Sequence, residues 1–203
     1  MNKLLIATNN HGKIKEFQEL LTGLDVELLT PDLIGLKLDV VEDGLTYAEN
    51  ASKKAVAFAH ASGLPSLADD SGLEVAALDG APGLYSARYS PRPGAKDADR
   101  RAFLLENLKH KPRPWTAHFH ATIAIAKPGE GVELAEGTCR GEIIPEERGT
   151  GGFGYDPIFL LTELGKTMAE LEMAEKNQLS HRARAVLAAR PILKRMFAMR
   201  KSK

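Results

Sequence analysis

Several acidic residues of this chain stand where a strand or a helix is expected to begin or end, and such carboxylates could bind a divalent metal or accept a proton. Asp69 and Asp70 follow the short apolar run Leu64–Leu67, which predicts a strand that gives way to a loop. Consecutive residues of an extended chain point to opposite faces, so we expect one aspartate to face a site and the other to be bonded elsewhere. A simple turn built from Asp, Ser and Gly is the alternative.

Residues 8–13 have the composition of a phosphate-binding segment. They follow the apolar strand Leu4–Ala7 and precede a helical apolar spacing that begins at Ile14. An asparagine can cap such a helix, and a lysine in its first turn opposes the helix dipole, so it calls for a reason such as a bound anion. An ordinary capped helix with an incidental lysine explains the same pattern. The residues are Thr8, Asn9, Asn10, His11, Gly12 and Lys13.

A second cation and a third carboxylate lie in the next part of the chain. Glu42 stands in an acidic turn, and Thr46 with Glu49 predicts a capped helix that ends at Gly63. Asn50 and Lys54 are four residues apart on this helix, so they share a face that is either surface or part of a site.

The glycine-rich segment 149–154 has the spacing GxGxxG but not the context of a dinucleotide-binding fold. Strand-like residues Ile158–Leu160 follow it where a helix would have to begin. A loop with so many glycines still allows a flat or anionic ligand to approach the backbone, and Phe153 and Tyr155 could stack on it. Further polar residues that could contribute are Asp156, Lys176, His181 and Arg182.

Length and composition limit the class of protein. The chain has 203 residues, 43% of them hydrophobic, which suits one domain or two intimate lobes without a metal or disulfide to hold it together. Lys plus Arg and Asp plus Glu both number 27, so overall charge gives no argument for a nucleic-acid partner. No apolar run is long enough to span a membrane, and we expect a cytoplasmic protein. The single Cys139 is expected to be buried.

The elements that would position these residues include one unmistakable strand, Trp115–Ala126, in which apolar residues alternate. Its two histidines, His118 and His120, are more readily explained as sheet residues than as metal ligands. A return strand after residues 128–131 makes a hairpin, and a terminal helix follows Ser180, with Pro191 expected to kink or restart it.

Seven short motifs, in this order, resemble the inosine triphosphate pyrophosphatase family, also called the Ham1 family, and the match extends from residue 3 to about residue 190. They are Thr8-Asn9-Asn10-x-x-Lys13, Glu42-Asp43-Gly44-x-Thr46, Glu49-Asn50-Ala51, Ala68-Asp69-Asp70-Ser71-Gly72-Leu73, Gly83-x-Tyr85-Ser86-Ala87-Arg88-Tyr89, Gly149-Thr150-Gly151-Gly152-Phe153-Gly154-Tyr155-Asp156-Pro157 and Ser180-His181-Arg182.

The resemblance implies an α/β fold with a long, bent mixed sheet, flanking helices and two lobes around a nucleotide cleft, all within a single domain, residues 1–203. It implies hydrolysis of deaminated purine nucleoside triphosphates (ITP, dITP and XTP) to the monophosphate and pyrophosphate. The cofactor would be Mg²⁺ and the active form a homodimer.

The resemblance also implies roles for individual residues. Asp70 would be the catalytic carboxylate, and Glu42 and Asp70 the metal ligands. The groups that would bind the triphosphate are Thr8, Asn10 and Lys13, whose segment also contains Asn9, His11 and Gly12, and Lys54, which lies three residues after the motif Glu49-Asn50-Ala51. The nucleotide and base contacts would be Ser71, Phe153, Gly154, Tyr155, Asp156, Lys176, His181 and Arg182. Asn9 stands where many relatives have glycine, which changes the local geometry but leaves Asn10 and Lys13 in place.

Two other functions use part of the same residues. A non-catalytic nucleotide-binding regulator would keep the glycine loop and the lysines but would not need Glu42 and Asp70. A general phosphohydrolase would not need Phe153, His181 or Arg182. The roles of Asp69 and Arg88, the preference among ITP, dITP and XTP, and the residue that rejects GTP are left open by the sequence.

Overall fold

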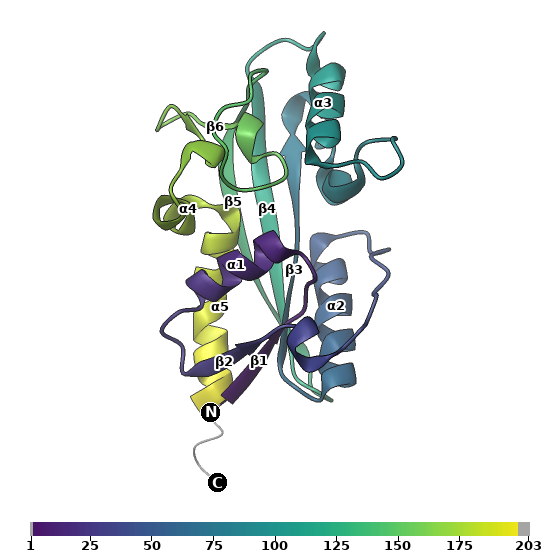
Figure 1. Ribbon diagram of the computed structural model, residues 1–203, viewed down its shortest axis with the longest axis vertical. Helices are drawn as coiled ribbons and strands as arrows, with labels where there is room; N and C mark the ends of the chain where they lie inside the picture. The colour runs from purple at the N-terminus through teal and green to yellow at the C-terminus, as the bar shows by residue number, and fades with distance from the viewer. Residues whose placement is uncertain (1, 199–203) are drawn as a thin grey trace. The chain divides into compact units, whose positions relative to one another are not determined.

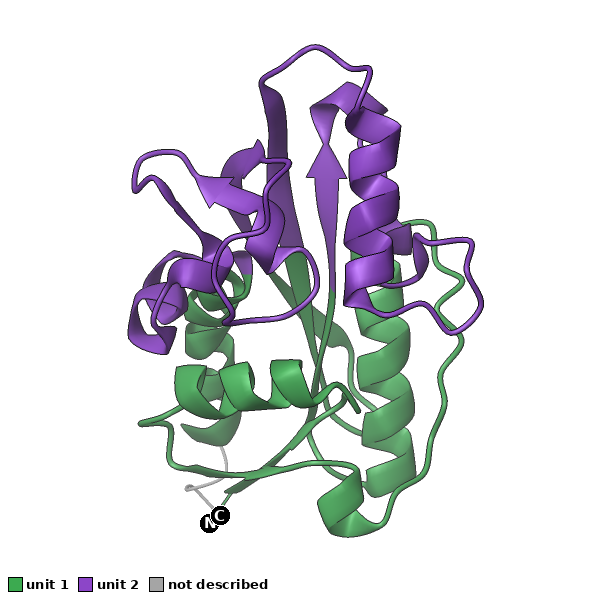
Figure 2. Ribbon diagram, turned by 45° about the horizontal axis from the view of Figure 1, so that its top comes forward, with its two compact units in different colours: residues 1–70, 121–137, 182–203 green, residues 71–120, 138–181 purple. Residues whose placement is uncertain are grey.

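A computed structural model describes residues 2–198, and the chain divides into two compact units (Figure 2). Unit 1 is formed by the described residues within 1–70, 121–137 and 182–203, and unit 2 by residues 71–120 and 138–181. The single domain with two lobes that the resemblance implies stays a prediction.

The strands form one mixed sheet of seven strands in the order β2-β1-β3-β4-β5-β6-β7 (Figure 1). Strand β1 pairs in parallel with β2 and β3, whereas β6 pairs antiparallel with β5 and β7. The predicted α/β class with a mixed sheet and flanking helices is therefore confirmed. The strands are β1 Asn2–Ile6, β2 Val26–Leu29, β3 Ser66–Val75, β4 Trp115–Ala126, β5 Val132–Ile143, β6 Phe159–Leu161 and β7 Lys166–Thr167.

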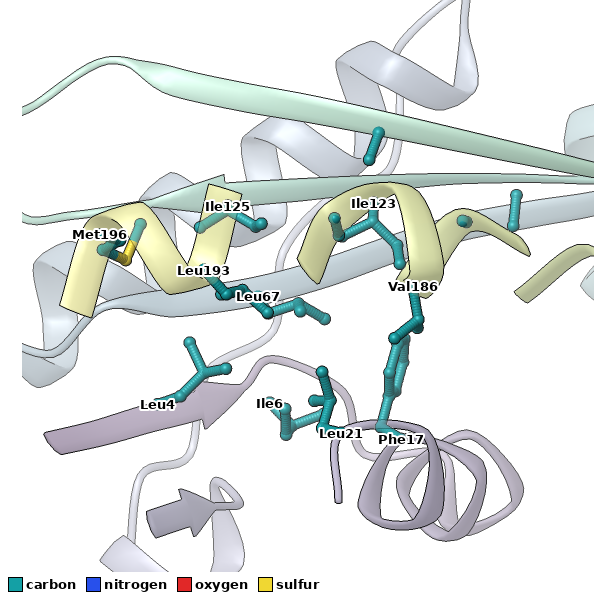
Figure 3. Packing of buried hydrophobic residues seen from close by; sticks show 14 of the residues in the cluster. Leu4, Ile6, Phe17, Leu21, Leu67, Ile123, Ile125, Val186, Leu193 and Met196 are labelled. Carbon is teal, nitrogen blue, oxygen red and sulfur yellow. The ribbon is translucent and has the colours of Figure 1, made fainter. Parts of the chain in front are cut away.

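In unit 1 the sheet is covered on both faces. One face packs against α1, His11–Leu20, and α5, His181–Ala198, through a cluster that includes Leu67 and Ile123 (Figure 3). The other face packs against α2, Tyr47–Ser62, whose small residues Ala51 and Ala55 let the helix approach Ala68 and Ala124 closely. Burial on both faces explains why β4 is apolar at nearly every position after residue 120.

Unit 2 has its own apolar cluster. Alternate residues of β4 up to Phe119 point into it, together with Leu104 and Leu108 of α3, Asp97–Leu108, and with Cys139, which is buried as expected. The short helix α4 is Met173–Leu179. Single 3-10 turns complete the chain at Asp32–Ile34, Ala76–Leu78, Gly83–Arg88, Asp156–Ile158 and Met168–Glu170.

The helix signals in the sequence were largely correct. Thr46 caps α2 by accepting a hydrogen bond from the Glu49 amide at 3.1 Å, and Gly63 ends the helix in the left-handed conformation with φ of 69°. Thr167 and Glu170, three residues apart as in a capping box, form one at the start of the 3-10 turn Met168–Glu170. Glu172 caps α4, but Lys176 of that helix pairs with Asp156.

Two expectations about regular structure were wrong. Asp69 and Asp70 do not lie in a loop, because β3 runs unbroken from Ser66 to Val75. Each carboxylate is instead satisfied by side chains on its own face, which removes the reason for the chain to turn. The expected restart at Pro191 is also wrong, because α5 continues through the proline, where burial of residues such as Leu193 offsets a cost of about 3 kcal/mol. A kink at Pro191 stays a prediction.

Within residues 2–198, no helix has both the length and the apolar character required to cross a bilayer.

Candidate active site

Strand β3 directs its two aspartates to opposite faces of the sheet in unit 1. Asp69 shares the face of Leu67, which is covered by α1 and α5, and Asp70 shares the face of Ala68, which is covered by α2. Both carboxylates are buried, with 2% and 7% of their surface exposed. The expectation that the two side chains have separate partners is confirmed, because they bond to different helices.

On the first face, Asp69 is held by two cations. The Lys13 Nζ atom of α1 lies 3.1 Å from its Oδ1 atom, and Nε and Nη2 of Arg182 donate to its Oδ2 atom at 3.2 and 3.0 Å. Arg182 also donates through Nη1 to the buried Glu16. Burial by itself would raise the pKa of Asp69, but Lys13 and Arg182 outweigh it and hold the pKa well below its usual range.

Lys13 shows the reverse balance. Burial lowers the pKa of its ammonium, and Asp69 raises it by a smaller amount, so that the pKa stays below the ordinary value. The side chain retains 16% exposure. A partly desolvated ammonium that is anchored at one buried carboxylate is well suited to receive a second anion.

On the second face, Asp70 belongs to a smaller group of charges. The Asn50 Nδ2 atom of α2 donates to Asp70 Oδ2 at 3.0 Å, and the Lys54 Nζ atom lies 3.6 Å from Asp70 Oδ1. The same Nζ atom is 3.0 Å from Oε1 of Glu42, so both carboxylates meet at one ammonium. Burial raises the pKa of Asp70, and Lys54 and Asn50 only partly oppose this.

Asn50 also fixes the loop that contains Glu42. Its Oδ1 atom accepts a hydrogen bond from the Gly44 amide at 2.8 Å while its Nδ2 atom binds Asp70. A Cβ atom at Gly44 would lie 2.7 Å from that Oδ1 atom, so the close approach requires glycine. The sequence placed Asn50 and Lys54 on a common face without deciding whether it was surface, and both residues contact the Asp70 carboxylate.

The Glu42 and Asp70 carboxylates fit the requirements of Mg²⁺. This ion prefers hard oxygen ligands and is usually held by one or two carboxylates, with phosphate oxygens and waters completing its coordination. Two carboxylates that meet at a single ammonium provide such a pair. Within residues 2–198 no group of three or more His, Cys, Asp and Glu side chains could hold a metal, so a cage made only of protein ligands is absent from this part of the chain.

The N-terminus of α1 matches its predicted form. Asn10 is the cap, and it accepts a hydrogen bond from the Lys13 amide at 3.1 Å, while its own amide donates to Thr8 Oγ1 at 3.2 Å. Asn9, Asn10 and His11 are exposed, and Thr8 and Gly12 are partly buried. Among the described non-glycine residues only Asp79 has a positive φ, so Asn9 adopts an ordinary backbone conformation.

In unit 2, a buried ion pair organises the glycine loop. The Lys176 Nζ atom lies 2.7 Å from Asp156 Oδ2, which also accepts a hydrogen bond from the Phe153 amide at 2.9 Å. The ammonium is 5.2 Å from the centroid of the Phe153 ring. Gly152 has φ of 70°, and a Cβ atom there would lie 2.0 Å from Asp156 Oδ2. Asp156 therefore shapes the loop around Phe153.

The other residues predicted to contact the nucleotide have mixed surroundings. The Tyr155 ring is buried in the unit 2 cluster, and its hydroxyl donates to the Ser86 carbonyl at 2.8 Å. The sequence led us to expect a ring that could stack on a ligand, but its burial leaves little of the ring exposed for stacking. His181 stacks on Phe119 with centroids 4.7 Å apart. Ser71 is partly buried on β3.

Arg182 was predicted as a base contact, yet its guanidinium is buried against Glu16 and Asp69 in unit 1. Glu16 was not singled out by the sequence. One signal was available, since Glu16 lies three residues after Lys13 and therefore on the same face of α1.

Comparison with known proteins agrees with these features. A sequence model of the Ham1 family matches residues 4–192. The chain is 47% identical to the dITP/XTP pyrophosphatase of Desulforamulus reducens over 196 residues, which covers 96% of this chain and 97% of that protein. It is 47% identical to the dITP/XTP pyrophosphatase of Geobacter sulfurreducens over 188 residues, or 92% of this chain and 94% of that protein.

Solved structures give the same result. A HAM1 protein from Coxiella burnetii superposes with a TM-score of 0.87 at 39% identity, covering 96% of this chain and all of that one. The Ham1 protein of Staphylococcus aureus gives a TM-score of 0.83 at 39% identity, with 95% and 98% of the two chains covered. In sequence and in fold alike, the chain belongs to the Ham1 family.

Proposed function

We propose that this chain hydrolyses deaminated purine nucleoside triphosphates (ITP, dITP and XTP) to the nucleoside monophosphate and pyrophosphate. Its relatives from Desulforamulus reducens and Geobacter sulfurreducens are dITP/XTP pyrophosphatases by name. The observation that carries the proposal to this chain is the meeting of Glu42 and Asp70 at the Lys54 ammonium. Two carboxylates beside a cation suit the hydrolysis of a phosphoanhydride that arrives with a divalent metal.

Glu42 and Asp70 would hold Mg²⁺. When bound there, the ion would neutralise charge on the phosphate oxygens. Lys54, which now balances the two carboxylates, would then be able to interact with phosphate as well. Asn50 keeps the Asp70 carboxylate oriented through its hydrogen bond to Oδ2.

The reaction is an in-line attack of water on the α-phosphorus. The water oxygen forms a bond to phosphorus, the bond to the bridging oxygen of pyrophosphate breaks, and the water proton passes to a carboxylate. Asp70 would accept that proton, since it is the buried carboxylate that Asn50 and Lys54 hold in place. Lys13 and Lys54 would stabilise the charge that develops on the leaving pyrophosphate.

The first turn of α1 would bind the triphosphate. Free amide groups at a helix N-terminus and the positive end of the helix dipole favour phosphate oxygens. Thr8, Asn10 and Lys13 add side-chain donors to the same segment. The alternative is an ordinary capped helix in which the Lys13 ammonium serves only as the partner of the buried Asp69 carboxylate.

Base recognition would use unit 2. The ring of Phe153 would stack on the purine, and Lys176 and His181 would donate hydrogen bonds to the 6-oxo group. Adenine presents an amino group at this position, so a donor would face a donor and ATP would be rejected. Guanine shares the 6-oxo group, so GTP must be rejected through its 2-position. We propose an indirect role for Arg182, through Asp69 and Lys13, in place of a base contact.

One assay separates this function from its rivals. Pyrophosphate release is measured with ITP, XTP, ATP and GTP in the presence of Mg²⁺, for the wild type and for Asp70→Asn. Absence of pyrophosphate from every substrate would leave a nucleotide-binding regulator, and equal rates on ATP and ITP would indicate a general phosphohydrolase. Release of orthophosphate in place of pyrophosphate would move the attack to the γ-phosphate and refute the mechanism.

We also propose that the chain works as a homodimer in the cytoplasm, as its family membership implies. Light scattering coupled to size-exclusion chromatography tests the first statement: a mass of one chain at working concentration would refute it. Fractionation of the cells that produce the protein tests the second.

A further inference from the structure

Two side chains of helix α3, those of Asp97 and Arg101, bind both backbone groups of a single residue of the glycine loop, Gly154, and we call this pair the clamp. The Gly154 amide donates to Asp97 Oδ2 at 2.8 Å, and the Gly154 carbonyl accepts from Arg101 Nη1 at 2.8 Å. Asp97 and Arg101 are four residues apart in the sequence, so they lie on the same face of α3. All three residues belong to unit 2.

Arg101 also holds the other end of the loop. Its Nε and Nη2 atoms donate to Oε1 and Oε2 of Glu147 at 2.8 and 2.9 Å, a two-point contact that lysine could not reproduce. Glu147 lies just before Gly149, where the glycine-rich segment begins. One guanidinium therefore ties the residues on either side of the loop to the same helix.

Phe153 lies next to this clamp. Its own amide donates to Asp156 Oδ2, and the following residue, Gly154, is held by Asp97 and Arg101. Backbone restraint on both sides leaves the Phe153 backbone little freedom, so the ring is aimed by contacts made elsewhere in unit 2.

The loop needs such restraint because of its composition. Gly154 has φ of 62°, and a Cβ atom there would meet no atom within 4 Å, so glycine is needed for the backbone conformation and not for space. Glycine-rich segments lose more conformational entropy on ordering than other segments do, so a loop of this kind stays in one conformation only when outside groups hold it.

We propose that Asp97 and Arg101 are positioning residues for base binding: by fixing Gly154 they hold the Phe153 ring in the orientation in which it stacks on the purine. This rests on the proposed function, in which Phe153 stacks on the base. Neither residue needs to touch the nucleotide. A purely structural role is the alternative, in which the clamp only stabilises unit 2.

The two roles differ in which substrates they affect. A structural defect lowers the fraction of folded enzyme and so reduces the rates on all substrates alike. If the Phe153 ring is no longer held in its orientation, only the interactions made by the base of the nucleotide are weakened. A substrate without a base, ribose 5′-triphosphate, therefore distinguishes the roles, since its hydrolysis to ribose 5-phosphate and pyrophosphate uses the phosphate-binding residues alone.

The test compares Arg101→Met and Asp97→Ala with the wild type. We expect the ratio of kcat/KM for ITP to that for ribose 5′-triphosphate to fall about tenfold, which is within the range for the loss of base stacking on an aromatic ring, with most of the change in KM. The rate on ribose 5′-triphosphate should stay within about twofold of wild type. The matched control is Lys109→Gln, which removes an exposed ion pair with Glu106 near the end of the same helix. This variant should change neither the ratio of kcat/KM values nor the rate on ribose 5′-triphosphate.

Glu147→Gln keeps the test informative if the first two variants fold poorly. Glu147 is half exposed, and its replacement loosens Arg101 without removing a partner of Gly154, so we expect a smaller change in the same direction. Equal losses on ITP, ATP and ribose 5′-triphosphate in these variants would overturn the proposal. So would an unchanged ratio of kcat/KM for ITP to that for ribose 5′-triphosphate in a folded Arg101→Met protein.

Failure of the proposed function gives a different result. In that case the wild type itself releases no pyrophosphate from ITP. Calorimetric titration with inosine 5′-monophosphate then tests the clamp without catalysis. Weaker binding to Arg101→Met than to Lys109→Gln supports the proposal, and equal binding refutes it.

Discussion

The two aspartates of β3 should respond in opposite ways to the same chemical change. Asp69→Asn removes a carboxylate that neutralises Lys13 and Arg182 inside unit 1. Asp70→Asn removes a carboxylate whose partner Lys54 keeps a second carboxylate, Glu42, at 3.0 Å. We therefore expect Asp69→Asn to damage mainly stability and Asp70→Asn to damage mainly activity.

The structure sets the size of the stability effects. Removing one partner of a buried charge pair costs about 3–5 kcal/mol, because the remaining charge stays buried without compensation. For a domain of this size that loss lowers the Tm by roughly 6–20 °C. Asp70→Asn should change stability by no more than about 1 kcal/mol, because burial already favours the neutral form of this side chain.

The pH dependence of stability provides an independent check on whether each aspartate stabilises or destabilises the folded chain. The pKa of Asp69 is lower in the folded than in the unfolded chain, so its stabilising contribution is complete above the unfolded pKa and is lost as pH falls through the folded pKa. The pKa of Asp70 is raised in the folded chain, so its ionised form opposes folding at neutral pH. That opposition is relieved as pH falls through its folded pKa.

Activity should show the reverse order. Loss of a group that accepts a proton in the reaction lowers kcat by roughly 100-fold to 10,000-fold, which is the expectation for Asp70→Asn. Asp69→Asn acts only through Lys13 and should cost about tenfold or less once the protein is folded. Urea unfolding and pyrophosphate release at saturating ITP measure the two effects.

Asp43→Asn is the matched control for both variants. Its carboxylate is exposed and pairs with Lys53, so the substitution should leave the urea midpoint of unfolding close to that of the wild type. The reasoning fails if Asp69→Asn unfolds at the same urea concentration as wild type. It also fails if Asp70→Asn retains more than about a tenth of the wild-type kcat.

Three further predictions follow from the same contacts. The acid limb of the pH profile of kcat/KM for ITP should lie above the pKa of an ordinary aspartate, about 4, because burial raises the pKa of Asp70 and its carboxylate is the active form. Asn50→Ala removes a hydrogen bond that lowers this pKa, so the variant should move the acid limb to higher pH. A shift to lower pH would contradict the prediction. Lys176→Met should destabilise the fold by about 3–5 kcal/mol in urea unfolding, because Asp156 loses its buried cation. Adding Asp156→Asn should recover part of this loss, and additive effects of the two substitutions would show that Lys176 and Asp156 are not coupled. Tyr155→Phe should cost about 1 kcal/mol in urea unfolding, because its hydroxyl donates to a backbone carbonyl, and leave the KM for ITP unchanged; a large rise in KM would instead place the hydroxyl against the nucleotide.

Local signals allowed much of the fold to be predicted. The alternation in Trp115–Ala126 predicted β4 with its correct bounds, and Thr46 and Gly63 gave both ends of α2. These signals act over a few residues, so they do not depend on the rest of the fold. The expected loop at Asp69 and Asp70 failed for the opposite reason: Lys13 and Arg182, which make a buried carboxylate acceptable in a strand, are far away in the sequence.

The same limit applies to the candidate site. Motifs identified Glu42 and Asp70, and helical spacing from Asn50 identified Lys54, but neither could reveal that the two carboxylates share the Lys54 ammonium as a partner. Arg182 was assigned to the base because a motif contains it, whereas its contacts with Glu16 and Asp69 appear only once α1, β3 and α5 are assembled. Pairings over more than 100 residues of sequence leave no local pattern to read.

The balance of charge on the two faces of β3 bears on which face does the chemistry. Among the described ion pairs on the Asp69 side, two carboxylates meet two cations, Lys13 and Arg182, so that group is neutral by itself. On the Asp70 side, the described ion pairs join two carboxylates, Glu42 and Asp70, to one ammonium, that of Lys54. A neutral buried group favours a fixed structure, while an excess of carboxylate attracts a cation. Strand alternation thus lets adjacent residues serve separate purposes: Asp69 completes a neutral buried group, and Asp70 remains in the group whose charge would be balanced by the divalent metal that accompanies a nucleoside triphosphate.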